Sequence, residues 1–170
     1  AQLNQTPTDT AILMQIRQQE ANVAGAEADL RQAEKTRAAQ LEAINASLDE
    51  AQGKVDSANA SVSNANAGIR SAQANLDNAT TKYNRIHDLY TQGYVAAQDV
   101  DDAKTTVSVQ QSVLEAARGQ LQSATAALKS ATAQQRSAEQ QAKVTRAKID
   151  ADVESAQVKV AQAKAALETA

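Results

Sequence analysis

Apolar residues recur every third or fourth position from Leu41 to Tyr90 without a lapse, and this spacing constrains the fold more than any other feature. It is the spacing of the a and d positions of a heptad repeat, which form the packing stripe, or seam, of a coiled coil. Larger residues alternate with alanine, and a row of alanines lets two helix backbones approach closely. The seam consists of Leu41, Ile44, Leu48, Ala51, Val55, Ala58, Val62, Ala65, Ile69, Ala72, Leu76, Ala79, Tyr83, Ile86 and Tyr90.

A second seam of the same kind runs from Val100 to Ala138, with two polar lapses at glutamines. The segment RIHDLYTQGYVAAQD, residues 85–99, lies between the two seams, and it holds or adjoins all three tyrosines and the one histidine. It also contains Gly93, and glycine is the residue that most readily adopts the left-handed conformation that ends a helix. The sequence therefore predicts that the chain turns back at this segment.

Both seams change phase once. Eleven residues separate Leu30 from Leu41 in the first, and eleven separate Ala142 from Val153 near the end of the chain. Four residues added to a heptad form a stutter, which locally unwinds a supercoil. The two stutters lie at similar distances from Gly93, so a turn there would bring them opposite each other. This symmetry predicts antiparallel pairing of the two arms.

We therefore expect an all-α fold, a long antiparallel two-helix coiled-coil hairpin. Its expected parts are a linker over residues 1–11, a first helix over residues 12–92, a tip turn over residues 93–96 and a second helix over residues 97–170. Proline occurs only once, at position 7, so no later proline interrupts either helix.

The tip turn is predicted in more detail. Gly93 is expected at the left-handed C′ position of a Schellman cap, with Tyr94 and Val95 folding back as its hydrophobic contact. Asp99 and Asp101 are expected in the first turn of the second helix, where negative charge complements the exposed amide groups.

The end of the first seam next to the turn has core residues on one side and outward-facing residues on another. Tyr83, Ile86 and Tyr90 continue the seam and are expected to close off the core. Arg85 and Leu89 lie off the seam and four residues apart, which places them on one outward face at the end of the hairpin. An arginine beside an exposed leucine is a contact pair suited to another protein.

The composition argues against catalysis and against metal or cofactor binding. One histidine and no cysteine cannot form the usual nitrogen and sulfur zinc site. No motif places a serine or cysteine nucleophile beside His87, and no glycine-rich phosphate loop occurs. We expect no enzyme activity, no cofactor, no metal site and no catalytic residues.

Charge and hydropathy also exclude classes of partner. The net charge is −3 with both signs interspersed, so no basic stripe for nucleic acid is present. The longest apolar run covers residues 11–14, far short of the roughly 20 residues that span a bilayer. The narrow seam lacks the aromatic and basic borders of a lipid-binding helix. We expect this segment neither to bind nucleic acid nor to insert into a membrane.

The tip carries a resemblance to a known family. Arg85, Leu89 four residues later and position 96 a further seven residues on, with Gly-Tyr-Val at 93–95 between them, resemble the hairpin tip of the periplasmic adaptor proteins. These HlyD-like proteins are also called membrane fusion proteins. Their pattern has arginine, leucine and serine at these three positions. Arg85 and Leu89 match it, whereas Ala96 stands in place of the serine.

The resemblance implies a function. In the family the hairpin tip docks on a TolC-type outer-membrane channel, and an inner-membrane transporter binds through other domains, which are absent from this chain. It further implies a homo-hexamer in the full-length protein, a periplasmic location with an inner-membrane anchor, and residues 1–11 as the end of a lipoyl half-motif. The tip residues expected to bind the channel are Arg85, Leu89, Tyr90, Gly93, Tyr94, Val95, Ala96 and Asp99.

One alternative of a different class remains open from the sequence. A structural coiled coil, such as a spacer or a chaperone arm, would show the same seams, and its Arg85 and Leu89 would then have no channel partner. Binding to a TolC-type channel separates the two hypotheses.

Overall fold

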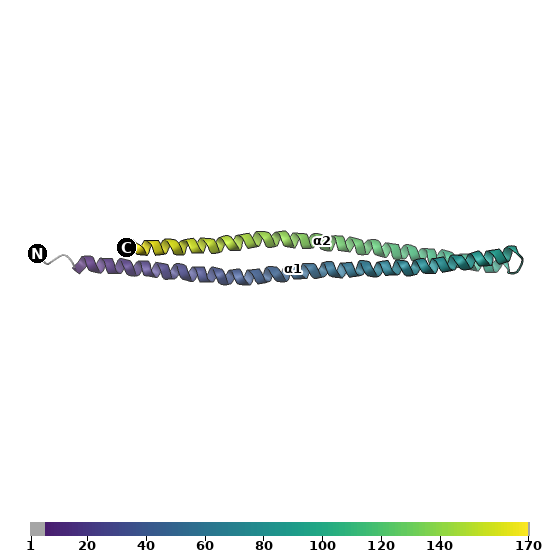
Figure 1. Ribbon diagram of the computed structural model, residues 1–170, viewed down its shortest axis with the longest axis horizontal. Coiled ribbons are helices and arrows are strands. Elements are labelled where there is room, and N and C mark those ends of the chain that lie inside the picture. The colour runs from purple at the N-terminus through teal and green to yellow at the C-terminus, as the bar shows by residue number, and fades with distance from the viewer. Residues whose placement is uncertain (1–5, 170) are drawn as a thin grey trace. The chain divides into compact units, whose positions relative to one another are not determined.

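The computed structural model describes residues 6–169, with side chains from Thr10 onwards. Helix α1 runs over Thr6–Thr91 and helix α2 over Ala97–Glu168, and a short turn joins them (Figure 1). The described residues contain no strand. The prediction of an all-α two-helix hairpin is confirmed.

The first helix begins earlier than expected. Residues 6–11, which the sequence analysis assigned to a linker, are already helical. Pro7 lies in the first turn, where the amide that proline lacks would have no partner within the helix, so it is tolerated there. Residues 1–5 and 170 lie outside the described residues, and the lipoyl assignment of residues 1–11 stays a prediction.

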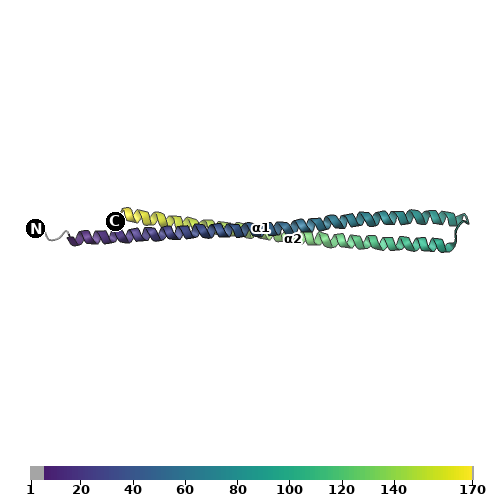
Figure 2. The same cartoon turned by 90° about the horizontal axis from the view of Figure 1, so that it is seen from below.

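The chain divides into two compact units. We call Glu50–Arg136, which contains the turn, the tip unit, and we call Ala1–Asp49 with Ser137–Ala170 the terminal unit. Each unit contains a segment of α1 and a segment of α2 that run in opposite directions (Figures 1 and 2). Among the described residues, no helix contains a stretch long and apolar enough to cross a membrane.

The core of the tip unit follows the predicted alternation of large and small residues. Its most buried side chains are mainly alanines, while large partners such as Ile69 and Leu76 are half-buried. Such burial is expected when alanine rows bring two helices close together. A hydrogen bond of 2.6 Å from Gln135 to Gln52 joins α2 to α1 and fixes the antiparallel register in this unit. The buried residues are Ala51, Val55, Ala65, Ala72, Ala79, Ala103, Leu114, Ala124 and Ala131.

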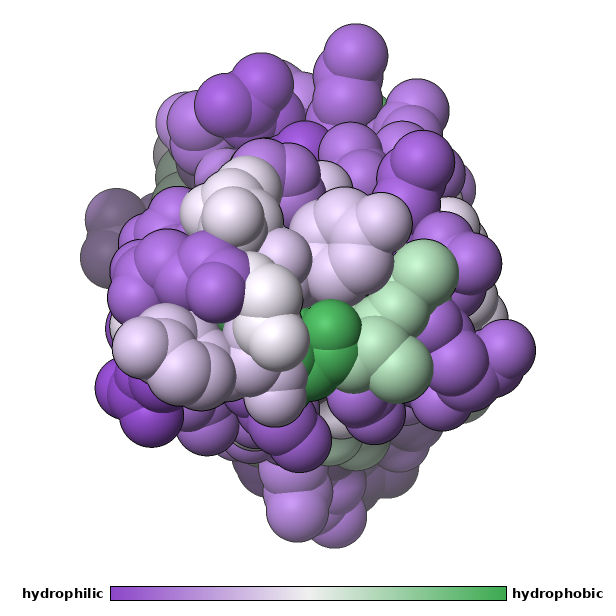
Figure 3. All heavy atoms as spheres, turned by 90° about the vertical axis from the view of Figure 1, so that its right-hand side faces the viewer, coloured by the Kyte–Doolittle hydropathy of each residue, from purple (hydrophilic) through white to green (hydrophobic). Residues whose placement is uncertain are grey.

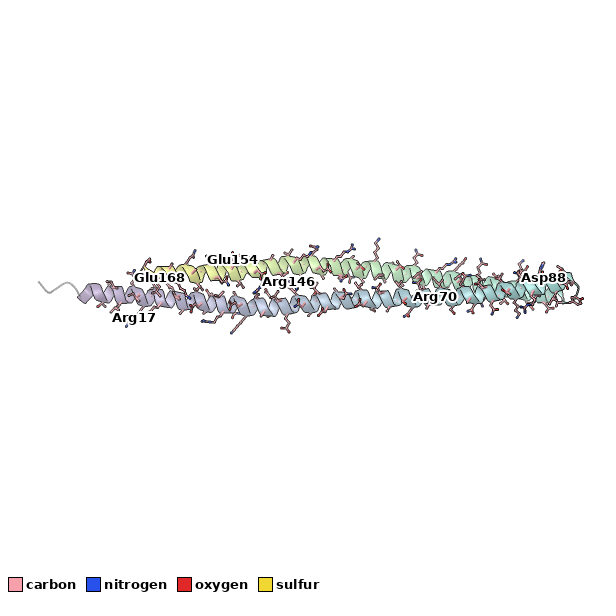
Figure 4. The ribbon with its side chains drawn as sticks, in the orientation of Figure 1. Arg17, Arg70, Asp88, Arg146, Glu154 and Glu168 are labelled. Carbon is pink, nitrogen blue, oxygen red and sulfur yellow. The ribbon has the colours of Figure 1, made fainter. Side chains whose placement is uncertain are left out.

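The terminal unit is held partly by polar contacts between its two helices. Lys164 forms an ion pair of 2.9 Å with Glu27. Arg146 reaches from α2 to the side-chain oxygen of Asn45 at 2.8 Å (Figure 4). These side chains lie on the surface, and exposed ion pairs typically contribute less than about 1 kcal/mol each. The polar contacts therefore set the register of the helices more than they stabilise them.

The stutters of both helices lie in this unit. On α2 the extra space between Ala142 and Val153 is filled by Ile149, which is only 4% exposed. On α1 all side chains of residues 34–40 are exposed. Within that stretch the Arg37 guanidinium binds Asp150, the neighbour of Ile149, at 3.0 Å. A buried isoleucine and a surface ion pair thus occupy the level at which the heptad pattern slips.

Candidate functional site: the interhelical tip

The turn that closes α1 is a Schellman motif, as predicted. Gly93 has φ of +80°, in the left-handed region. Its N–H donates to the carbonyl oxygen of Tyr90, and the N–H of Tyr94 donates to that of Leu89, both at 2.9 Å. These are the two hydrogen bonds that define the motif, and they satisfy carbonyl groups that a helix end otherwise leaves free.

The start of α2 is fixed by an aspartate. The N–H of Ala96 donates to Asp99 Oδ2 at 3.1 Å, and the N–H of Asp99 donates to the carbonyl oxygen of Ala96 at 3.1 Å. Ala96 is therefore the N-cap residue and Asp99 is at N3, which is the arrangement of a capping box. Because alanine has no side-chain oxygen, only the half of the box contributed by Asp99 is formed.

The sequence analysis did not foresee that hydrogen bond, since it placed Asp99 in the first turn only for its charge. The spacing of three residues between positions 96 and 99 was the available signal. Asp101 was expected in the same turn. Since α2 begins at Ala97, its first turn contains Asp99 but not Asp101.

Two neighbouring residues of α1 differ from their expected exposure. Leu89, predicted to point outward and be exposed, is half-buried, and Tyr90, predicted to continue the core, is 45% exposed. Both residues lie at the end of α1, where their carbonyl groups accept the hydrogen bonds of the Schellman turn. Arg85 is exposed, as expected.

The turn residues themselves present an apolar surface. Tyr94, expected to fold back onto α1, is instead 74% exposed, and Val95 is half-buried. Tyr94 therefore does not supply the hydrophobic contact that often accompanies a Schellman motif. Figure 3 views the molecule from the end that carries the turn and shows hydrophobic and neutral residues at the centre, surrounded by hydrophilic ones. The tip can thus offer an apolar contact inside a polar border.

A groove of about 200 Å³ lies beside the turn, between α1 and α2. Ile86 and Ala103 contribute apolar surface to it, while Lys82, Asp99 and Asp102 contribute charge. On α1 the half-buried Tyr83 contacts the ring of the exposed His87, with a centroid distance of 5.9 Å. The exposed His87 ring thus contacts a tyrosine that belongs to the seam.

The side chains that the structure describes offer no obvious reactive centre. None of the buried residues in this part of the chain is polar or charged. No group of three or more histidine, cysteine, aspartate or glutamate side chains among the described residues could hold a metal ion.

Comparison with known proteins identifies the tip region. Residues 61–136 match the family model described as the RND MFP, alpha-helical hairpin domain. Over these residues the chain is similar to the helical hairpin of the membrane fusion proteins. The resemblance predicted from Arg85, Leu89 and their neighbours is thereby confirmed at the level of the family.

The matched residues fall within the tip unit and include every residue predicted to bind the channel. The described part of the terminal unit lies outside the match. A search of curated proteins and a search of solved structures each returned no match to the chain. The site geometry and the family model therefore support a membrane-fusion-protein hairpin, and the partner must be argued from the tip itself.

Proposed function

We propose that this hairpin belongs to a periplasmic adaptor that links an inner-membrane exporter to a TolC-type outer-membrane channel, with the tip as the docking surface. The hairpin acts without catalysis or cofactor. The exporter binds through domains outside this chain, and the full-length adaptor is a homo-hexamer anchored to the inner membrane. The family match of residues 61–136 supports the adaptor role.

The observation that carries the docking proposal is an ordered turn that exposes a mixed surface. The backbone is held on the α1 side by the two Schellman hydrogen bonds and on the α2 side by Asp99. Since such a turn is already ordered before binding, little conformational entropy is lost when a partner docks. Tyr94, at 74% exposure, is the largest apolar group available to that partner.

The tip residues divide into two kinds of contact. Arg85 can donate to carboxylate or carbonyl oxygens of the channel, and its guanidinium can form two parallel hydrogen bonds with one carboxylate. Tyr90 and Tyr94 add exposed aromatic surface, which is common at interface hot spots. Leu89 is half-buried and therefore offers less surface than the two tyrosines.

The test is channel binding by variants of the tip. Arg85→Ala should weaken binding to a purified TolC-type channel about tenfold or more, because truncating a hot-spot residue typically costs about 2 kcal/mol or more. Arg70→Ala removes another exposed arginine of α1, far from the turn (Figure 4), and should leave binding unchanged. Circular dichroism checks that both variants keep their helical content. If the two variants bind as well as the unchanged protein, the tip is not the docking surface, and the alternative of a structural coiled-coil spacer is favoured.

A further inference from the structure

The groove of about 200 Å³ beside the turn has a shape suited to a side chain from outside. We call it the tip groove, and its walls are Lys82 and Ile86 on α1 with Asp99 and Asp102 on α2. Since a cavity of roughly 150 Å³ can hold benzene, the tip groove has room for one large side chain. A second groove of about 370 Å³ shares three lining residues with it, among them Lys82. The joined grooves therefore fit an elongated segment of polypeptide.

The two walls of the tip groove carry opposite charges. Lys82 lies on the α1 wall, whereas Asp99 and Asp102 lie on the α2 wall, and all three are exposed. No described residue lies close enough to Lys82 to form an ion pair with it. The buried Ala79 and Ala103 also line the groove. The tip groove thus has a basic wall, an acidic wall and an apolar floor.

Both carboxylates of the acidic wall can accept further hydrogen bonds. Asp99 Oδ2 accepts the N–H of Ala96 at 3.1 Å, and Asp102 Oδ1 accepts the side-chain amide of Gln98 at 3.0 Å. The other oxygen of each carboxylate forms no hydrogen bond with a described residue. Since an ionised carboxylate has about four acceptor sites, both aspartates can bind an incoming ammonium or guanidinium group.

The basic wall lies on the same side of α1 as two of the proposed channel contacts. Lys82, Arg85 and Leu89 are spaced by three and four residues, which places them along one face of the helix. Lys82 is about one helical turn from Arg85, on the side away from the turn. A partner that contacts Arg85 and Leu89 therefore reaches the tip groove without leaving this face.

We propose that the tip groove receives a segment of the channel that directs a basic side chain toward Asp99 and Asp102 and an acidic side chain toward Lys82. The inference rests on the proposed docking function and adds to it the residues that select the channel. The aliphatic part of the basic side chain packs on Ile86 and Ala103, while its charged end reaches the carboxylates. A channel with the reverse order of charges brings like charges together and is rejected.

Charge reversal in the full chain tests the tip groove. Lys82→Glu and Asp102→Lys should each weaken binding to a purified TolC-type channel about fivefold or more, because each replaces an attraction between partly exposed charges by a repulsion. The matched controls are Lys104→Glu and Asp101→Lys, which make the same charge changes on α2 outside the groove. They should alter binding less than about twofold, since salt screens charges at a distance. Circular dichroism checks the helical content of all four variants.

A double variant separates the arrangement of the charges from their sum. Lys82→Glu combined with Asp102→Lys keeps the net charge of the tip groove but exchanges the basic and acidic walls. It should bind the channel at least as weakly as either single variant. Binding at the level of the unchanged chain would overturn the proposal, because only the net charge would then matter.

The same binding assay distinguishes failure of this inference from failure of the docking function. If Arg85→Ala weakens binding while the groove variants bind like their controls, the inference is overturned and the docking function stays. If the groove variants weaken binding and Arg85→Ala does not, the groove contact is upheld and the role of Arg85 is lost. If the unchanged chain does not bind the channel, both proposals are overturned.

Discussion

The half-formed capping box at the start of α2 makes a quantitative prediction for Ala96→Ser. In the structure the N–H of Ala96 already donates to Asp99 Oδ2, at 3.1 Å. A serine at position 96 would offer its hydroxyl oxygen as a second acceptor to the N–H of Asp99, which now donates to the Ala96 carbonyl oxygen, and would thus complete the box. Exchanging alanine for serine at an N-cap stabilises a helix by about 1 kcal/mol. Position 96 is exposed, so the hydroxyl displaces no packed side chain.

Hydrogen exchange is the suitable assay because the effect is local. The chain has two compact units, and a global melt need not follow a single transition. A gain of about 1 kcal/mol corresponds to about fivefold slower exchange through local opening. We expect that slowing at the amides of residues 97–100, and no change in the terminal unit.

The matched control is Ala97→Ser, which adds the same hydroxyl one residue later, where it cannot cap the helix. This variant should leave exchange unchanged or slightly faster, since serine is a poorer helix former than alanine. If Ala97→Ser slows exchange as much as Ala96→Ser does, or if neither variant has any effect, then the hydrogen bonds assigned to this turn do not control its stability.

Three further predictions concern other parts of the chain. Gly93→Ala should destabilise the turn by roughly 1–2 kcal/mol, because its φ of +80° is unfavourable for a residue with a Cβ. Gly119→Ala should instead stabilise its helix by up to about 1 kcal/mol. Hydrogen exchange should therefore become faster around position 93 and slower around position 119. Ile149→Ala should lower the free energy of unfolding by about 2–5 kcal/mol in urea titrations, because the side chain is 4% exposed. The hydrogen bond and charge of Lys164 hold the pKa of Glu27 below its ordinary 4.5. The stabilisation from this pair is therefore present above pH 4.5 and disappears as the pH falls through the lowered pKa. Glu27→Gln should lower the free energy of unfolding at pH 7 and leave it unchanged in acid.

Most of the fold could be predicted because it depends on a repeated pattern. The spacing of three and four from Leu41 onwards determines which side of each helix is buried, and a single glycine at position 93 determines where the chain reverses. Helix α1 begins at Thr6 and not at residue 12 as expected, because the first helical turn tolerates Pro7. Ile149 was missed for a similar reason, since a heptad template has no position for a core residue inside a stutter.

The exposure of the tip residues could not be predicted because the heptad pattern stops applying where the partner helix ends. A seam residue is buried only if the facing helix covers it, and beyond Ile86 the covering chain is a turn. Its path is set by hydrogen bonds to the carbonyl groups of Leu89 and Tyr90, and the position of Gly93 predicts these bonds but not the exposure of the neighbouring side chains. In this turn Leu89 is half-buried, whereas Tyr90 and Tyr94 are exposed. If the tip docks on a channel, its affinity should therefore depend on the turn geometry as well as on the side chains, and Gly93→Ala should weaken binding even though every contacting side chain is unchanged.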